Sequence, residues 1–112
     1  GTFQAVSAAP MHTCGITTAG SVVCWGWNNK GQATPAEGTF QSVSAGHEHT
    51  CGVTTAGSVV CWGSDYAGQT SSPEGTFQTV SAGFGHTCGL TTEANVVCWG
   101  WNADGQSTPP EL

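Results

Sequence analysis

Basic residues are almost absent from this sequence of 112 residues. It contains one Lys and no Arg against seven acidic residues, which gives a formal net charge of −6. Proteins that bind nucleic acid contact its phosphates through clusters of Lys and Arg. The composition therefore predicts that nucleic acid is not a partner.

Long apolar runs and helical periodicity are also missing. No apolar run approaches the ~18 residues of a membrane-spanning helix, and no segment spaces its apolar residues as a helix does. No charged-then-apolar leader is present. We therefore expect a soluble, mature or trimmed segment without a membrane span.

What the chain does contain is an internal repeat with a strict period of 37 residues. The copies occupy residues 1–37, 38–74 and 75–111, and Leu112, which is left over, is counted with the third blade (75–112). Each copy reads Gly-Thr-Phe-Gln-x-Val-Ser-Ala, then His-Thr-Cys-Gly, then Val-Val-Cys-Trp-Gly. A fixed period near 40 residues with about three strands in each unit predicts a β-propeller or a β-solenoid.

The segment from His12 to Gly26 predicts a β-hairpin with a definite register. If a three-residue loop is centred on Ala19, facing residues have numbers that sum to 38. Two pairs then share one face, because side chains alternate along a strand: Cys14 with Cys24, and Ile16 with Val22. The other face carries Val23, Trp25 and Trp27. Both faces are apolar, so neighbours must cover the hairpin on both sides.

The opening segment of each copy predicts a third strand. Strict alternation places Phe3, Ala5 and Ser7 on one side, and Gln4, Val6 and Ala8 on the other. We therefore expect an all-β fold in which each copy is a three-stranded antiparallel, propeller-like blade.

Six cysteines in three evenly spaced pairs indicate an oxidising compartment, the alternative being three reduced cytosolic pairs. The hairpin register predicts a bridge within each copy: Cys14–Cys24, Cys51–Cys61 and Cys88–Cys98. The other repeating scheme joins Cys24 to Cys51 and Cys61 to Cys88. Zinc is disfavoured because the two cysteines of a copy are ten residues apart and oppose each other in a sheet. We expect a secreted or cell-surface location.

The motifs resemble those of a known repeat family. Val-Ser-Ala-Gly-x-x-His-Thr-Cys-Gly-Leu-Thr at 80–91, with Val-Val-Cys-Trp-Gly-x-Asn-x-x-Gly-Gln at 96–106, resembles the repeat of the regulator of chromosome condensation family. The short repeat is most similar to secreted members, including the propeller that inhibits β-lactamases. The resemblance implies a non-enzymatic propeller that binds proteins through loops on one face. It also implies a ring of about seven blades, which three blades cannot close.

A histidine and a tryptophan recur at fixed positions. The histidines, His12, His49 and His86, allow two interpretations. One is a ring of imidazoles that binds a metal. The other, which the family motif favours and which we expect, is a structural histidine bonded to a backbone carbonyl of the adjacent strand. The tryptophans, Trp25, Trp62 and Trp99, are expected to pack between blades.

Enzyme chemistry has little support in the sequence. No Gly-x-Ser-x-Gly elbow, phosphate-cradling loop or His-Glu-x-x-His motif occurs. Residues 102–105 faintly resemble a calcium loop but lack its further carboxylates and bidentate Glu. We therefore expect no enzyme activity, no metal and no cofactor.

Two loops vary from copy to copy, one before the repeated histidine and one after the hairpin. Several of their side chains are aromatic or charged, as in surfaces that contact a protein or a sugar ring. The candidate binding surface comprises Pro10, Met11, Trp27, His47, Glu48, Asp65, Tyr66, Phe84, Trp101 and Asp104.

The first and third copies each keep one apolar face uncovered. Terminal repeats that are soluble alone usually carry polar caps, and neither end of this chain has one. We predict that the chain self-associates through its end blades. The leading functional hypothesis is an extracellular binding module that does so and presents its variable loops to a protein or carbohydrate. The alternatives are a structural subunit of a ring or filament and a protein inhibitor of an enzyme.

Overall fold

Residues 1–110 of the chain are described by a computed structural model, so the predicted linker position Glu111 and Leu112 lie outside the described residues. They form nine strands: β1 (Phe3–Ala8), β2 (His12–Thr17), β3 (Val22–Gly26), β4 (Phe40–Ala45), β5 (His49–Thr54), β6 (Val59–Gly63), β7 (Phe77–Ala82), β8 (His86–Thr91) and β9 (Val96–Gly100). The strands make three separate antiparallel sheets in the orders β1-β2-β3, β4-β5-β6 and β7-β8-β9. The all-β fold with one three-stranded blade per copy is confirmed. No helix in the described residues is long and apolar enough to cross a membrane.

The hairpin register is confirmed in every copy. Cys14 faces Cys24 and Ile16 faces Val22, and the residues 37 and 74 positions further on repeat this pairing. All three bridges lie within copies: Cys14–Cys24, Cys51–Cys61 and Cys88–Cys98. The alternative scheme between copies is wrong. Three disulfides within the repeats indicate an oxidising environment.

The predicted orientation of Phe3 is wrong. The pairing of β1 with β2 shifts between Phe3 and Ala5, so a β-bulge at Gln4 turns Phe3 to the opposite face from the one that strict alternation assigns. Its ring covers Gly15, where a Cβ would lie 2.7 Å from a ring carbon, and meets Trp25 edge to face at 6.0 Å. The Gln4 amide donates to the Thr17 carbonyl at 3.0 Å. The same bulge recurs in β4 and β7.

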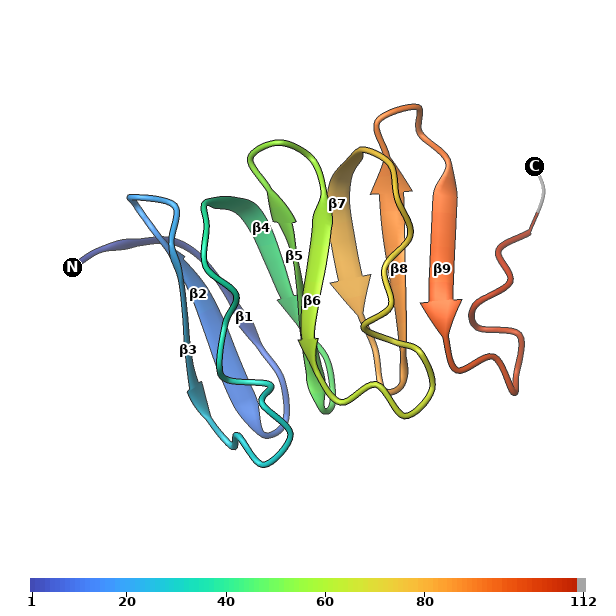
Figure 1. The fold of residues 1–112 in the computed structure, drawn as a ribbon, viewed down its shortest axis with the longest axis horizontal. Helices are drawn as coiled ribbons and strands as arrows, with labels where there is room; N and C mark the ends of the chain where they lie inside the picture. The colour runs from blue at the N-terminus through green and yellow to red at the C-terminus, as the bar shows by residue number, and fades with distance from the viewer. Residues whose placement is uncertain (111–112) are drawn as a thin grey trace.

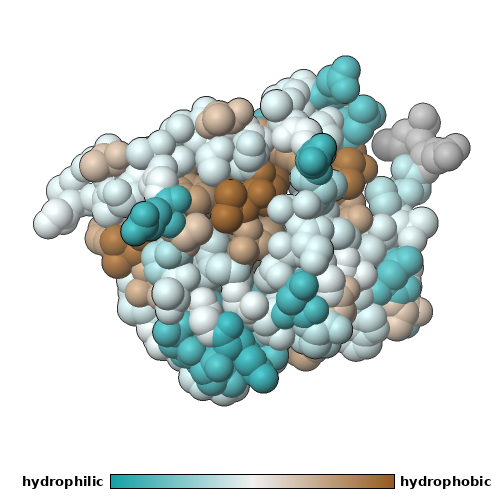
Figure 2. Space-filling view, viewed as in Figure 1, coloured by the Kyte–Doolittle hydropathy of each residue, from teal (hydrophilic) through white to brown (hydrophobic). Residues whose placement is uncertain are grey.

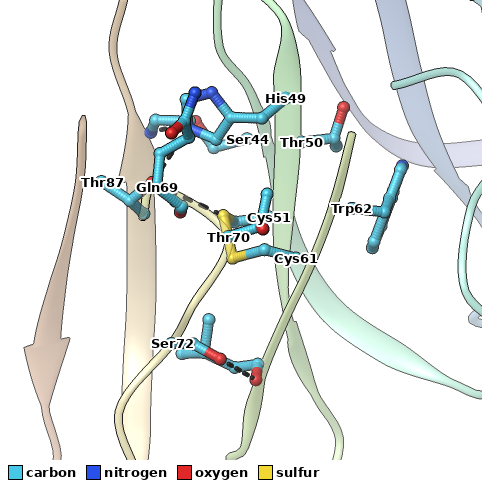
Figure 3. The surroundings of a disulfide bond; sticks show 12 residues. Ser44, His49, Thr50, Cys51, Cys61, Trp62, Gln69, Thr70, Ser72 and Thr87 are labelled. Atoms are coloured by element: carbon cyan, nitrogen blue, oxygen red, sulfur yellow. Dashed lines mark hydrogen bonds between the residues drawn. A yellow bond between two sulfur atoms is a disulfide. The ribbon is translucent and has the colours of Figure 1, made fainter. Parts of the chain in front are cut away.

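Each blade therefore has two distinct apolar faces. The disulfide face carries the bridge and the aliphatic pair beside it. The tryptophan face carries the Phe, Val and Trp that recur in each copy, which in blade 1 are Phe3, Val6 and Trp25. Figure 3 shows the two faces of blade 2, with the Cys51–Cys61 bridge on one side of the sheet and Trp62 on the other. Thr87 and Gln69 lie on the side of the bridge, because blade 3 and its preceding loop cover that face.

The core lies between the sheets, where the disulfide face of one blade contacts the tryptophan face of the next. Between blades 1 and 2 it contains Cys14, Ile16, Val22 and Phe40, with Trp62 packed against them. Between blades 2 and 3 it contains Cys51, Val53, Val59, Phe77 and Val80, with Trp99. Figure 1 shows the three sheets side by side, with the N-terminus beside blade 1.

Within residues 1–110, one face at each end of the array has no covering blade. On the tryptophan face of blade 1, Phe3 is 50% exposed, although its equivalents Phe40 and Phe77 are each 2% exposed. On the disulfide face of blade 3, Val96 is 50% exposed, whereas its equivalents Val22 and Val59 are each 8% exposed. Figure 2 shows apolar surface at the blade-1 end of the molecule.

Candidate functional site

The variable loops of all three blades lie at the same end of their sheets, at the bottom of Figure 1. Within each blade the two loops are joined by a backbone hydrogen bond. The N–H of Trp27 donates to the Met11 carbonyl at 2.8 Å, and the corresponding bonds join Ser64 to Glu48 and Trp101 to Gly85. The two loops that vary in sequence therefore form one continuous edge in each blade.

Aromatic side chains from blades 2 and 3 meet at this end. The imidazole of His47 stacks on the ring of Phe84 at a centroid distance of 4.3 Å, and Phe84 lies 6.1 Å from Trp101. The hydroxyl of Tyr66 lies close to Gly85, where a Cβ would be 2.6 Å from it. We call His47, Tyr66, Phe84 and Trp101 the aromatic cluster.

A shallow cleft of about 280 Å³ lies beside the aromatic cluster. It is lined by three equivalent segments, each formed by the end of the first strand of a blade and the loop that follows: residues 8–10, 45–47 and 82–84. Its lining is mostly small and apolar, with His47 and Phe84 at one end. Pro10 therefore belongs to the same hollow as the aromatic cluster, although it lies in blade 1.

The other predicted residues are not all part of this cluster. Met11 and Trp27 are exposed in the loops of blade 1, and Asp104 is exposed in the last loop. The Asp65 carboxylate accepts hydrogen bonds from the Thr70 N–H at 2.8 Å and the Ser71 hydroxyl at 3.0 Å. Partial burial acts to raise the pKa of Asp65, but these hydrogen bonds outweigh it and lower the pKa below its usual value. Asp65 thus shapes its own loop.

Two of the three recurring histidines bond to the next blade. His12 Nε2 lies 2.7 Å from Thr50 Oγ1, and His49 Nε2 lies 2.9 Å from Thr87 Oγ1. The Thr50 hydroxyl donates to the Gln32 carbonyl at 2.9 Å, so it accepts from the imidazole Nε2–H. The Nε2 partner of His12 and of His49 is thus a threonine hydroxyl of the next blade, where a backbone carbonyl of the adjacent strand was expected. Within residues 1–110, no group of three or more His, Cys, Asp or Glu is placed to hold a metal ion.

One glutamine that the sequence pattern did not reveal completes each interface between blades, Gln32 in the first and Gln69 in the second. The Gln32 carbonyl also accepts the indole N–H of Trp62 at 3.0 Å, and the Gln69 carbonyl accepts that of Trp99 at 2.9 Å. Both glutamines are fully buried, and the Gln32 amide oxygen accepts from the Lys30 N–H at 2.8 Å. Their only signal in the sequence is the Gly-Gln pair that ends each variable loop.

Replacing Thr87 with valine is expected to lower the free energy of unfolding by about 1–3 kcal/mol, because it leaves the buried His49 Nε2 without its partner. Thr13 occupies the same position on the open face of blade 1, so Thr13→Val is the matched control and should cost less in dilute protein. Urea unfolding of the two variants measures the difference. Equal losses would show that the threonine stabilises its own strand and not the contact between blades.

Acidification is expected to destabilise the fold between pH 7 and pH 5. Burial lowers the pKa of His49 to about 4, and it also lowers that of His12. A backbone hydrogen bond with His86 acts to raise the pKa of His49, the nearby imidazoles of His12 and His86 lower it further, and Asp65 acts to raise it. The unfolded imidazole has a pKa near ~6.5, so below that pH the unfolded chain binds more protons. The contribution of His49 to the free energy of unfolding is therefore fully present above about pH 6.5 and is lost as the pH falls towards 4.

For His49 alone the expected loss between pH 7 and pH 5 is about 2 kcal/mol. Urea unfolding at both values measures it. His49→Gln, which cannot titrate, should be less stable at pH 7 but should lose much less on acidification. A variant with the same pH dependence as the unchanged protein would place the titrating group elsewhere.

Three small antiparallel sheets stacked face to face, with every strand order the same, define a propeller-type array of blades. The family profile of the regulator of chromosome condensation (RCC1) repeat matches residues 11–32, 40–69 and 77–106. The chain belongs to this family. A sequence search among curated proteins finds no significant match.

Solved structures of longer proteins contain a similar array. The ectodomain of the receptor kinase CR4 from Physcomitrella patens superposes with a TM-score of 0.79 at 31% identity, over 89% of this chain and 30% of that one. The CRINKLY WD40 ectodomain of the Arabidopsis thaliana receptor kinase ACR4 gives 0.76 at 30% identity, over 88% and 38%. Prp20p from Saccharomyces cerevisiae gives 0.81 at 15% identity, over 96% and 32%. The chain thus spans about a third of the length of the proteins it matches.

Proposed function

We propose that the chain is an extracellular, non-enzymatic binding module that assembles end to end with copies of itself. Its variable loops then present a recognition surface to a protein or glycan. The three disulfides support an extracellular location, as does the 30–31% identity to two receptor-kinase ectodomains. A closed ring and a filament are both products of such assembly, and an inhibitor of an enzyme would use the same loops.

The observation that carries the assembly is that the end faces expose the side chains that are buried between blades. Val6 is 66% exposed on blade 1, whereas its equivalent Val80 is 7% exposed under blade 2. At ~25 cal/mol per Å², a few hundred Å² of apolar surface at each end corresponds to several kcal/mol. A contiguous apolar patch of that size is typical of an interaction site.

The mass of the protein in solution tests this proposal. Light scattering at micromolar concentration is expected to give at least twice the chain mass of 11.4 kDa, with dissociation on dilution. Two chains supply six blades, a number that closes in known propellers, and larger masses indicate an open stack. A mass near 11.4 kDa at every concentration would contradict the proposal.

The aromatic cluster favours the second part of the proposal. Tyr66, Phe84 and Trp101 are 59%, 55% and 42% exposed, so their rings are available to stack on a sugar ring or an apolar side chain. A glycan array probed with the protein and with Trp101→Ala is expected to show binding that this variant loses. Met11→Ala, in an exposed loop outside the cluster, is the matched control and should bind normally. Array binding that survives in Trp101→Ala would move the ligand site away from the cluster.

A further inference from the structure

We propose that the copies join head to tail. The tryptophan face of blade 1 in one chain docks on the disulfide face of blade 3 in the next, and the junction repeats the contact between blades 1 and 2 and between blades 2 and 3. This inference rests on the proposed end-to-end assembly and specifies its polarity and its contacts. The occupant of each open face is a second copy of this chain.

The disulfide face of blade 3 contains a hollow that fits the second copy. The hollow measures about 180 Å³ and is apolar, with Cys88, Leu90 and Val96 in its lining. On blade 2 the equivalent residues, Cys51, Val53 and Val59, receive Phe77 and Val80 of blade 3. Two periods earlier in the sequence the equivalents of these two residues are Phe3 and Val6, which are exposed on blade 1. Phe3 of the next chain therefore occupies the hollow.

The donors and acceptors that form the hydrogen bonds between blades are present a third time, divided between the two ends of the array. Between blades, a glutamine carbonyl accepts from an indole N–H and a threonine hydroxyl. Blade 3 is followed by Gln106, and its loop has the same form as the first, since the Asp104 N–H donates to the Gln106 amide oxygen at 2.8 Å. The second copy supplies Trp25 and Thr13 as donors to the Gln106 carbonyl. His86 then faces Thr13 as His49 faces Thr87.

The backbone at the junction also fits. Gly46 of blade 2 lets the Gly83 carbonyl approach so closely that a Cβ would lie 2.5 Å from it, and the His47 N–H donates to this carbonyl at 3.1 Å. Blade 3 has a glycine at the equivalent position, Gly83, and the next residue, Phe84, has a backbone N–H that can donate. Blade 1 has Ala9 and Pro10 there, and proline has no N–H to donate. The loop of blade 3 thus matches that of blade 2, whose backbone N–H donates across the junction between blades 2 and 3.

Polarity follows from this complementarity. Two tryptophan faces brought together would oppose indole and threonine donors to each other without the glutamine carbonyl. Two disulfide faces would oppose two Gln106 carbonyls without an indole donor. Only the head-to-tail arrangement supplies donors to acceptors and fills the hollow with an aromatic ring, as both internal interfaces do.

The test uses one charged substitution on each face. Val6→Asp disables the head, which is the tryptophan face of blade 1, and Val96→Asp disables the tail, which is the disulfide face of blade 3. Both side chains are at least half exposed in the single chain, at 66% and 50%, so each variant is expected to fold, and circular dichroism checks this. Ala19→Asp, in the exposed hairpin turn, is the matched control and should assemble as the unchanged protein does.

Each face variant alone is expected to have a mass near 11.4 kDa by light scattering. An equimolar mixture should form a 1:1 complex of about twice that mass, because it retains one intact head and one intact tail. Self-association of Val6→Asp alone would show a tail-to-tail contact, and that of Val96→Asp alone a head-to-head contact. Either result, or a mixture without a complex, overturns this inference. If the unchanged protein is itself monomeric, the proposed assembly fails and not merely its polarity.

Discussion

Replacing Phe77 with alanine is expected to lower the free energy of unfolding by about 3–5 kcal/mol. Phe77 is 2% exposed and lies in the core between blades 2 and 3, with its ring against Gly89 and edge to face with Trp99 at 6.2 Å. Gly89 provides the space for the ring, so nothing nearby can fill the cavity that the alanine leaves. Urea unfolding at a concentration where the protein is dissociated measures the loss.

Phe3 provides the matched control for this prediction. It has the same sequence context and the same edge-to-face contact with a tryptophan, but it is 50% exposed. Phe3→Ala should therefore cost the dissociated chain well under half as much as Phe77→Ala, and it should weaken assembly. If both variants lose the same stability, the phenylalanine stabilises its own blade and the contact between blades contributes little.

Removal of the Cys51–Cys61 disulfide is the second large effect. Replacement of both cysteines with alanine is expected to lower the free energy of unfolding by about 3–5 kcal/mol. About 3 kcal/mol of this comes from releasing a ten-residue loop in the unfolded chain. The rest comes from the core, because Cys51 is fully buried and belongs to the same cluster as Val53 and Phe77. Thermal or urea unfolding measures it.

The third bridge separates these two contributions. Cys88–Cys98 closes a loop of the same length but lies on the open disulfide face of blade 3, where Cys88 is only half-buried. Its removal should lower the free energy of unfolding of the dissociated chain only by the ~3 kcal/mol that comes from releasing the loop in the unfolded state. An equal cost for the two bridges would indicate that packing of the sulfur atoms adds nothing.

The blades could be predicted from the sequence because each hairpin is a local structure repeated three times. The pairing of Cys14 with Cys24 follows from loop length and side-chain alternation alone, and it holds in every copy. The side of the sheet that Phe3 occupies could not be predicted, because a β-bulge at Gln4 adds one residue and reverses the alternation before it. A bulge of this kind has no distinctive residue type in this sequence.

The site was predictable in part. Variation between copies identified His47, Phe84 and Trp101 as surface residues, but their contact with one another depends on the spacing between blades 2 and 3, which no local pattern sets. The interface acceptors at Gln32 and Gln69 were missed because the atom that acts is a backbone carbonyl, which every residue has. The hydroxyl partners of the histidines were missed because they lie 38 residues away, in the next blade.

The two ends of the array are expected to complete each other as the blades do internally, and the indole N–H of Trp25 reports on this contact most directly. Trp62 and Trp99 donate to glutamine carbonyls between blades, so their indole hydrogens are expected to exchange slowly with solvent. Nuclear magnetic resonance of the indole N–H signals is expected to show Trp25 protected to a similar degree at assembling concentrations and unprotected on dilution. Fast exchange of Trp25 at every concentration, with Trp62 and Trp99 protected, would contradict the account.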